Sequence, residues 1–455
     1  MQNSSSNTPN KMGTAKMFPL IMSMSLPAMF SMLIQALYNV VDSYFVSLVS
    51  ENALTAVSLA FPIQMLIIAV GAGTSIGLNS LISRRLGEGD YKSAGDAAAH
   101  GLVLAFISWI VFALAGFFLS RPVISAFGAD DTVTEMAVSY LSIVLTCSVG
   151  VFVEINLEKT LQATGDMVFP MFFQLTGAIG NIILDPIFIF GLFGLPALGV
   201  AGAAVATVVA QIISMVFAMI VVFKRKNQIS INLKGFRFNG KIIKDIYSVG
   251  IPSIIMQSIS SLLNMALNGI LITFSQTAVA VLGVYYKLQS FVFMPVFGLT
   301  HGLMPIMGYN FGAKNKHRLM SCLKIGLSIA VVIMSVGMAI FWAIPKELLS
   351  IFNSSGSQEL FNIGIPALRT ISLCFIPAAL GITFSTVFSA LGYGSRSLVV
   401  SLIRQLVAIL PMAYFFAKIS LNAVWYAFPL AEIVAFAVSI LLFADLYKKT
   451  VSNLP

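Results

Sequence analysis

Residues 27–42 read PAMFSMLIQALYNVVD, and residues 252–267 read PSIIMQSISSLLNMAL. Pro27 and Pro252, the first residues of these two stretches, define an offset between the two halves of the chain. The same offset relates further identical pairs: Asn39 with Asn264, Gly87 with Gly312, Ser125 with Ser350, and Phe127 with Phe352. The chain is therefore predicted to be a duplication, in which two similar halves fill 455 residues.

The composition of the chain is that of a membrane protein. Apolar residues make up 58% of it and charged residues 9%, and the mean hydropathy is +0.94, far above that of an ordinary soluble domain. Twelve apolar runs, six in each half, are long enough to cross about 30 Å of hydrocarbon as helices. They lie at 18–46, 53–83, 94–120, 133–157, 168–193, 198–223, 242–273, 277–310, 319–344, 359–389, 397–417 and 422–446.

These runs predict an all-α integral membrane protein with twelve transmembrane helices. Because each half has an even number of spans, both halves enter the membrane in the same orientation, as parallel repeats. We expect two six-helix lobes, residues 1–223 and 245–455, joined by a basic connector at 224–244. Internal repeats of this kind are typical of secondary transporters, whose substrate and ion sites lie between the repeats near the middle of the bilayer.

The formal net charge of +9 is explained by membrane topology. If the N-terminus is cytoplasmic, nineteen Lys and Arg residues fall on the cytoplasmic side, and three, Arg121, Lys346 and Lys418, fall outside. This is the positive-inside pattern, and such scattered residues form no basic stripe for nucleic acid. We expect a multi-pass protein of the inner (cell) membrane, monomeric, with both termini in the cytoplasm and no nucleic-acid partner.

Acids inside the predicted spans are the most informative polar residues, because a charge at the bilayer centre costs about 3 kcal/mol or more. Four are found: Asp42, Glu154, Asp185 and Glu432. Asp42 ends a stripe formed with Ser31, Gln35 and Asn39, whose spacings of three and four put it on one face of a helix. The stripe lines a cavity or, alternatively, forms a ladder of hydrogen bonds between helices.

Asn181 and Asp185 stand one helical turn apart in GNIILDPIFIFG, residues 180–191. Pro186 denies the carbonyl of Ile182 its amide partner, so this proline is a predicted hinge. Carboxylate, amide and carbonyl oxygens are ligands that a hard cation prefers. The alternative is a kinked helix whose aspartate pairs with a neighbouring donor. Thr207, in the next span, could complete the site or bond its own backbone.

The second half keeps a polar stripe but lacks the acids. Leu267 stands at the position equivalent to Asp42. Lys287 and Glu432 are the buried charges of this half, and they could bind substrate or pair with each other. We expect the substrate cavity to be lined by Gln35, Asn39, Glu154, Gln257, Asn264, Asn268, Lys287 and Glu432.

Six short motifs, in this order, resemble those of the multidrug and toxin extrusion (MATE) transporters, prokaryotic type. They are NVVD at 39–42, RLGEG at 85–89, QATGD at 162–166, NIILDP at 181–186, GAAVAT at 202–207 and YNFGAK at 309–314. The resemblance covers the chain from Pro27 to about Glu432.

Similarity to this family implies two six-helix lobes in a V that open alternately to each side of the membrane. It implies export of organic cations and amphiphilic drugs in exchange for inward sodium ions or protons, with no other cofactor. The implied cation site consists of Asp42, Asn181, Asp185 and Thr207, which would hold sodium if sodium is the coupling ion. Acids that some members carry in the second lobe are absent at 257–268, 277–300 and 371–389.

The main alternative is a flippase for lipid-linked precursors, from the same broad superfamily. Its phosphate-bearing substrates need a cavity lined by Arg and Lys, whereas the predicted spans carry acids in the first half and only Lys287 deep in the second. A channel would need a symmetric ring of charges. An enzyme is not expected either, because His, Cys and Ser form no catalytic constellation. Two neighbouring carboxylates in a low-dielectric cavity require a proton or a cation, which favours the antiporter.

Overall fold

The computed structural model describes residues 10–224, 229–234, 236–352 and 356–455, and only the backbone of Asn39, Val40, Ser43, Tyr44, Ser47 and Glu51. Over these residues the chain is helical, without strands. The first half contains α1 (Lys11–Thr14), α2 (Met17–Ser47), α3 (Glu51–Gly87), α4 (Tyr91–Ser125), α5 (Asp131–Thr146), α6 (Val149–Ala163), α7 (Val168–Phe190), η1 (Leu192–Gly194) and α8 (Val200–Lys224). The second half contains α9 (Gly240–Leu271), α10 (Gln276–Gly312), α11 (Lys316–Ala343), α12 (Pro345–Ser350), α13 (Gln358–Ser372), α14 (Phe375–Ala390), α15 (Gly394–Leu402), η2 (Ile403–Ile409), α16 (Leu410–Ala417), α17 (Leu421–Val424), α18 (Ala427–Lys449) and η3 (Val451–Asn453).

The number of membrane spans agrees with the sequence. In the described part of the chain, ten segments are long and apolar enough to cross a membrane. Two bent pairs, α5 with α6 and α13 with α14, raise the number to twelve if each pair is one span. The protein is therefore a multi-pass membrane protein, and the prediction of twelve helices is confirmed.

The duplication is visible in the helix boundaries. α3 runs from Glu51 to Gly87 and α10 from Gln276 to Gly312, so the offset between Pro27 and Pro252 relates both their first and their last residues. The preceding residues, Ser50 and Ser275, accept the backbone N–H of the residue three positions later, at 3.0 and 3.1 Å. A serine cap satisfies a backbone donor that the first helical turn leaves without a partner. The same signal thus starts both helices.

The two bends also occupy equivalent places in the repeats. The bend between α5 and α6 is 45° and falls at Cys147 and Ser148, and the bend between α13 and α14 is 46° and falls at Leu373 and Cys374. The span predicted over 133–157 is therefore bent rather than straight. Just after the first bend, Gly150 lies so close to the backbone of α8 that a Cβ atom would overlap it. The bend turns α6 towards this contact.

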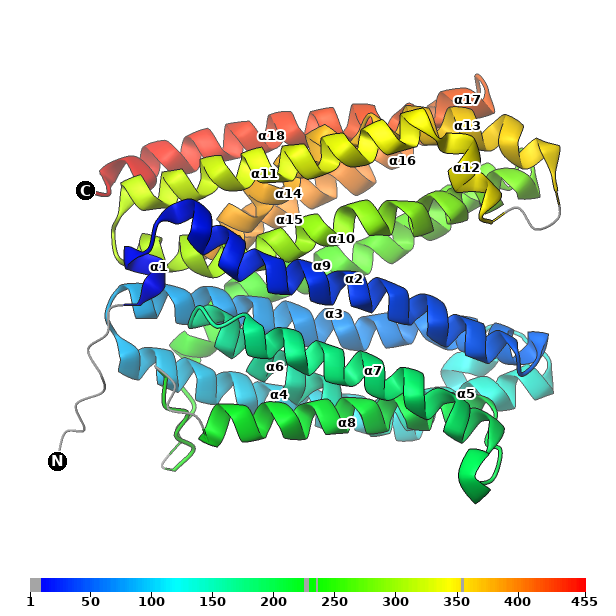
Figure 1. Ribbon diagram of the computed structural model, residues 1–455, viewed down its shortest axis with the longest axis horizontal. Coiled ribbons are helices and arrows are strands. Elements are labelled where there is room, and N and C mark those ends of the chain that lie inside the picture. Colours follow the sequence, from blue (N-terminus) through cyan, green and yellow to red (C-terminus); the bar gives the residue numbers. More distant parts are fainter. Residues whose placement is uncertain (1–9, 225–228, 235, 353–355) are drawn as a thin grey trace.

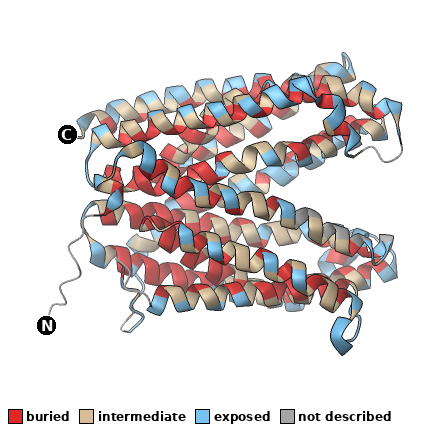
Figure 2. Ribbon diagram, viewed as in Figure 1, coloured by how far each residue is buried: buried red, intermediate tan, exposed pale blue. Residues whose placement is uncertain are grey.

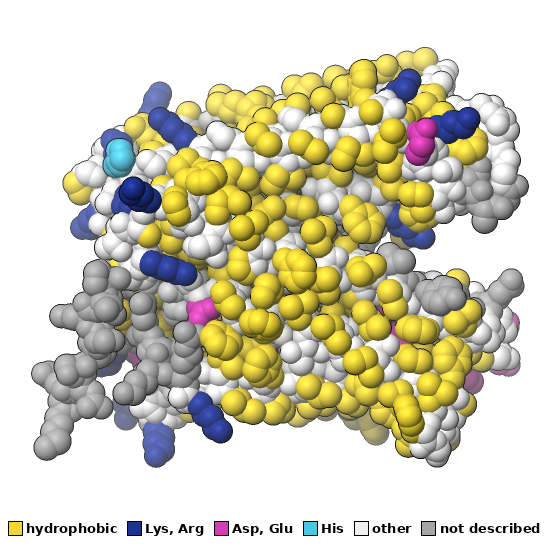
Figure 3. Space-filling view, in the orientation of Figure 1, with side chains coloured by type: hydrophobic (Ala, Val, Ile, Leu, Met, Phe, Trp, Pro, Cys, Tyr) yellow, Lys and Arg dark blue, Asp and Glu magenta, His cyan; other side chains and the backbone are white. Residues whose placement is uncertain are grey.

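Figure 1 shows two groups of helices that lie together at the end with both termini and diverge towards the opposite end. α3–α8 form one group and α9–α18 the other, which we call the first and second lobes. Buried residues continue from one lobe to the other near the termini (Figure 2). The space-filling surface is hollowed between the lobes at the diverging end (Figure 3). The arrangement is a V with its cleft away from the termini.

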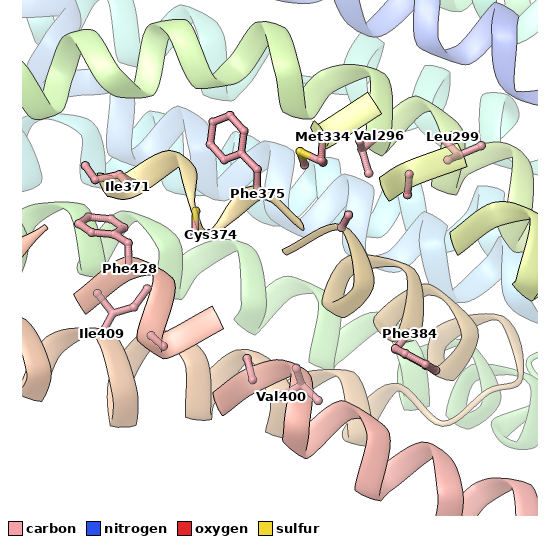
Figure 4. Close-up of a cluster of buried hydrophobic side chains, with 14 of the residues drawn as sticks. Val296, Leu299, Met334, Ile371, Cys374, Phe375, Phe384, Val400, Ile409 and Phe428 are labelled. Atoms are coloured by element: carbon pink, nitrogen blue, oxygen red, sulfur yellow. The ribbon is translucent and has the colours of Figure 1, made fainter. Parts of the chain in front are cut away.

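Each lobe has its own apolar core. The core of the first lobe includes Phe152 and Phe173, and that of the second lobe includes Phe375 and Phe428, which Figure 4 shows with Cys374 at the bend after α13. Helix α1 and the first turns of α2 contribute to the second core, through Met12, Leu20, Ile21 and Met24. The N-terminal segment therefore starts on the second lobe. The chain division at 224–244, part of which lies outside the described residues, stays a proposal.

Two pairs of glycines, which we call the glycine seams, bring helices from the two halves of the chain into close contact. Gly73 and Gly77 of α3 lie against α9, and their repeat equivalents, Gly298 and Gly302 of α10, lie against α2. At each of the four, a Cβ atom would overlap the neighbouring helix. Small residues four positions apart allow such close packing of membrane helices. The sequence analysis did not use these pairs.

Candidate ion-coupling site

Helices α2, α7 and α8 bring together the four residues predicted for the cation site. Asn181, Asp185 and Thr207 are buried, and Asp42 is half-buried. α7 packs against both other helices. Its glycines, Gly177 and Gly180, meet the small side chains of Ser214 and Ala210 on α8. This close packing places Thr207 beside Asn181.

The carboxyl groups of Asp42 and Asp185 lie within hydrogen-bonding range of each other. Two ionised carboxylates repel strongly at this range in a medium of low dielectric constant. A pair in such contact is stable when it shares a proton or holds a cation. The geometry therefore brings two acids together at a place where a shared proton or a cation would stabilise them.

Asn181 connects α7 with α8. Its Nδ2 atom lies 3.1 Å from Thr207 Oγ1. With the amide turned over, Nδ2 donates to Asp185 Oδ2 at 2.8 Å, and Oδ1 accepts from Thr207 Oγ1 and the Thr207 backbone N–H, both at 3.1 Å. We adopt the turned orientation because amide orientation is assigned from hydrogen bonds, and this one satisfies both ends. Asn181 then holds the Asp185 carboxylate in place.

Two tyrosines that the sequence analysis missed complete the polar cluster. The Tyr38 hydroxyl is within hydrogen-bonding range of Thr207, and both tyrosines lie near the two aspartates. Tyr140 donates a long hydrogen bond to Gln64 Oε1, at 3.4 Å. Tyr38 stands one turn before Asp42, a spacing that places both on one helical face. Tyr140 comes from α5, and no local pattern in the sequence connects it with this site.

Asp42 also borders a pocket that is open to the outside of the molecule. The pocket has a volume of about 170 Å³ and is further lined by Val46, Leu54, Val57, Ser58 and Phe61. Sites for drug-sized ligands have about 300–1,000 Å³. The pocket is therefore smaller than a site for a drug-sized ligand, and it exposes Asp42 to the outside of the molecule.

Most residues predicted to line the substrate cavity lie apart from this cluster. Gln257, Asn264 and Asn268 form an exposed face of α9, while Leu263 and Leu267, about a quarter of a turn away around the helix, are in the core. Polar side chains are costly in lipid, so we expect this face to line the cleft. Gln35 is half-buried on α2. The Asn39 side chain lies outside the described residues.

The predicted pair of Lys287 and Glu432 is not formed. Glu432 Oε1 lies 3.5 Å from Arg404 Nη1, because η2, which carries Arg404, packs against α18. The Lys287 ammonium is exposed and lies 5.7 Å from the centre of the Phe352 ring. Arg404, not Lys287, is therefore the ion-pair partner of Glu432.

Glu154 does not line the cleft either. It is buried on α6, near Glu158 and Lys159. Lys159 was counted among the cytoplasmic charges, but it is buried and lies 2.9 Å from Glu158. Because Glu158 balances the charge of Lys159, this lysine does not need to face water.

Pro186 stands four residues before the end of α7, and the helix continues through it to Phe190. Among the described residues, the membrane spans broken by a bend of more than 40° are those after α5 and α13. A hinge at Pro186 stays a prediction.

Comparison with known proteins shows the family of this chain. The family model described as MatE matches residues 27–187 and 252–415, two stretches that start at the equivalent prolines of the repeat, Pro27 and Pro252. The chain belongs to the MatE family. Its twelve-helix, two-lobe fold is that of solved MatE structures. MatE proteins similar to it are transport proteins.

Three relatives illustrate this similarity. The multidrug export protein MepA of Staphylococcus aureus (strain bovine RF122 / ET3-1) is 26% identical over 418 residues, 91% of each chain. A MOP superfamily transporter from Pyrococcus furiosus has a TM-score of 0.92 and 29% identity over 98% of this chain and 100% of that one, and is described as having a binding pocket of reversed polarity that suggests a different function. An outward-facing multidrug resistance MATE family transporter has a TM-score of 0.89 and 29% identity over 94% of this chain and 96% of that one.

Proposed function

We propose that this MatE transporter is a secondary active antiporter that exports organic cations and amphiphilic drugs in exchange for inward sodium ions or protons. Relatives named for multidrug export and multidrug resistance support the drug substrates. The observation that carries the coupling is the contact between the carboxyl groups of Asp42 and Asp185. This pair needs one positive charge, and losing it makes the two carboxylates repel.

Helix α2 connects this site with both lobes. Its first turns pack in the second core, and Asp42, near its other end, meets Asp185 of the first lobe. A change in charge at Asp42 therefore acts on the helix that touches both sides of the cleft. A ligand shifts a two-state equilibrium only through its different affinity for the two states, and the aspartate pair supplies such a difference.

The surroundings of Asp42 and Asp185 support a proton, rather than sodium, as the ion bound in this conformation. A direct hydrogen bond between two carboxyl groups requires a shared proton. In the turned orientation, Asn181 also directs its nitrogen, not its oxygen, at Asp185. Sodium would need Asn181 to turn its oxygen towards the ion and the carboxyl groups to separate. Asp42, Asn181, Asp185 and Thr207 carry suitable oxygen ligands for that state.

The energy available from one ion is sufficient for useful export. One positive charge that moves inward across 100 mV gives about 2.3 kcal/mol. At about 1.4 kcal/mol for each tenfold step, this supports nearly two decades of gradient for a neutral substrate. A monovalent cationic substrate exchanged one for one gains only the chemical gradient of the ion.

We place both termini in the cytoplasm of a cell whose inner membrane holds the protein as a monomer. Figure 1 shows the two termini at one end of the molecule, as an even number of spans requires. Lys and Arg residues concentrate on the connector and loops assigned to that side, in keeping with the positive-inside rule. In this orientation the cleft opens to the outside, which is where an exporter releases its substrate.

Efflux of a fluorescent cationic dye from proteoliposomes, with sodium and pH gradients imposed separately, tests the proposal. We expect one of the two gradients to drive dye movement, and Asp42→Asn to abolish it. A flippase would move lipid-linked phosphates and show no dye movement under either gradient. That result would overturn the proposed function.

A further inference from the structure

A second buried group of polar side chains lies along α6. It consists of Glu154, Glu158, Lys159 and Gln162 of α6, Gln174 of α7 and His301 of α10, which we call the α6 cluster. Gln174 stands three helical turns before Asp185 on α7, a distance of about 16 Å along a helix. The α6 cluster is therefore separate from the aspartate pair.

Lys159 uses all its donors within the cluster. Its Nζ lies 2.9 Å from Glu158 Oε1, 3.0 Å from Gln162 Oε1 and 3.5 Å from His301 Nδ1. An ammonium group has three N–H donors and accepts nothing, so His301 Nδ1 accepts and its ring proton sits on Nε2. The contact with His301 is the longest of the three and the one that crosses to the second lobe.

Glu158 is fully paired. Its Oε1 accepts from Lys159 and also from Gln162 Nε2, at 2.6 Å, and its Oε2 accepts from Gln174 Nε2 at 3.0 Å. A carboxylate that accepts three hydrogen bonds has little hydrogen-bonding capacity left unmet. Glu158 and Lys159 therefore form the ionic centre of the cluster.

Glu154 has no such partners. It stands one turn before Glu158 on the same face of α6, and it is near enough to Glu158 and Lys159 to interact electrostatically. Its side chain is 9% exposed, and among the described residues its Oε1 has no hydrogen-bond partner. The neighbouring Gln174 Oε1 also lacks a partner there. An acid group in this environment can be satisfied by gaining an O–H donor.

The charges of the cluster balance only with one additional positive charge. Glu154 and Glu158 both ionised would leave one negative charge unpaired beside the single Lys159 cation, and a buried unpaired charge costs several kcal/mol. Helices α3 and α7 bring neutral amides, Asn79 and Gln174. The Lys159 ammonium occupies the centre and would repel a metal ion. A proton is the cation that fits.

We propose that the α6 cluster is a second proton-binding site, in which Glu154 takes the proton and the occupancy controls the Lys159–His301 contact between the lobes. With the proton bound, Glu154 is neutral and Lys159 keeps the three bonds seen here. When the proton leaves, the Glu154 carboxylate competes for a Lys159 donor, and the longest bond, to His301, is the one that breaks. Proton loss thus weakens closure on the side of the termini. This inference does not depend on the identity of the exported substrate.

His301 sets the lower limit of the pH range for a test. If the ring gains a second proton, Nδ1 becomes a donor that faces Lys159, and the same contact is lost by repulsion. Measurements should therefore start near neutral pH and proceed upwards, where Glu154 is the group expected to change.

The full chain carrying Asp42→Asn and Asp185→Asn, with its cysteines replaced, isolates this site from the aspartate pair. Spin labels at Lys92→Cys on α4 and Ala313→Cys after α10, both exposed near the termini, report the separation of the lobes in lipid nanodiscs. We expect the closed population to fall as the pH is raised from neutral, by at most tenfold per pH unit for one proton. Glu154→Gln, which mimics the protonated acid, should keep this end closed throughout.

The control is Glu135→Gln, on an exposed acid that pairs with Arg121 on the surface, and it should retain the pH dependence. His301→Phe removes the acceptor and should leave this end open at every pH, which provides a second variant if Glu154→Gln does not fold. The infrared band of protonated carboxyl groups near pH 7 should lose the intensity of one group in Glu154→Gln. No pH dependence in the parent, pH dependence that survives Glu154→Gln or His301→Phe, or an unchanged band would each overturn the proposal.

Discussion

Asp42 on α2 and Asp185 on α7 present their carboxyl groups to each other, and only Asp42 borders the open pocket. Asp185 is 0% exposed. An ion that enters through the pocket reaches Asp42 first and Asp185 second. The two acids are therefore not equivalent in their access from outside the molecule.

Asp42→Asn should abolish ion-driven dye efflux while the protein still inserts and folds. The amide keeps the size of the side chain but removes the charge that the ion needs. Efflux from proteoliposomes measures the effect, and Glu135→Gln, at the surface, serves as the control with unchanged efflux. Full efflux by Asp42→Asn would show that another group couples the ion.

Thr207→Val should weaken ion dependence without abolishing transport. The change removes the hydroxyl next to Asn181 and Tyr38, and the loss of one hydrogen bond costs about 1 kcal/mol, which corresponds to about a fivefold higher ion concentration for half-maximal efflux. Thr176→Val is the matched control, because that hydroxyl bonds the carbonyl of Phe172 in its own helix. Equal ion dependence in both variants would remove Thr207 from the site.

Gly77→Ala should destabilise the contact between the lobes. A Cβ atom at this position would overlap the backbone carbonyl of Ile246 on α9, and overpacking of this kind typically costs about 1–3 kcal/mol. We expect a lower melting temperature in detergent and impaired transport. Gly283→Ala on α10, where a Cβ meets open space, should show neither effect. If both variants melt alike, the glycine seams are not needed for close packing.

Pro186→Ala should leave the protein as stable or more stable, but slower in transport. Alanine restores the backbone donor that proline lacks, and proline inside a helix costs about 3 kcal/mol. Melting temperature and turnover are measured on the same preparation, with Pro122→Ala on α4 as the control helix. Unchanged turnover would mean that α7 moves as a rigid body.

A cysteine at Arg237, in the exposed part of the connector, tests the orientation in the membrane. In a chain without its native cysteines, it should resist an impermeant thiol reagent in intact cells and react in inverted vesicles. A cysteine at the exposed Asp131, at the start of α5, should behave in the opposite way. The reverse pattern would place the termini outside.

Much of the fold could be predicted from the sequence, because the offset between the repeats and the length of the apolar runs can both be read along the printed chain. The bend at Cys147 could not be predicted in this way, because it lies next to the contact of Gly150 with α8, a helix that is distant in the sequence. The glycine seams were present in the sequence as pairs four residues apart, but which helix each pair meets depends on the arrangement of the lobes.

For the site, spacing and family resemblance brought out Asp42, Asn181, Asp185 and Thr207, and the structure places them together. Their role in coupling stays a prediction. Tyr140 and Gln64 left no local signal, because they reach the cluster through contacts between distant helices. The burial of Lys159 could not be predicted for a related reason: a count of charges along the chain does not reveal that a lysine lies beside a glutamate.

The glycine seams also bear on how such a chain arose. Under the repeat, α3 corresponds to α10 and α2 to α9, so the contact of α3 with α9 and the contact of α10 with α2 are one interface made twice. Two identical half-chains related by a twofold axis would form just this pair of self-complementary contacts. Once the two copies of such a dimer are joined in one chain, the sequence of each half can change independently of the other. Leu267, at the position equivalent to Asp42, shows that the two halves have since diverged where the charge resides while keeping the contact that holds them together.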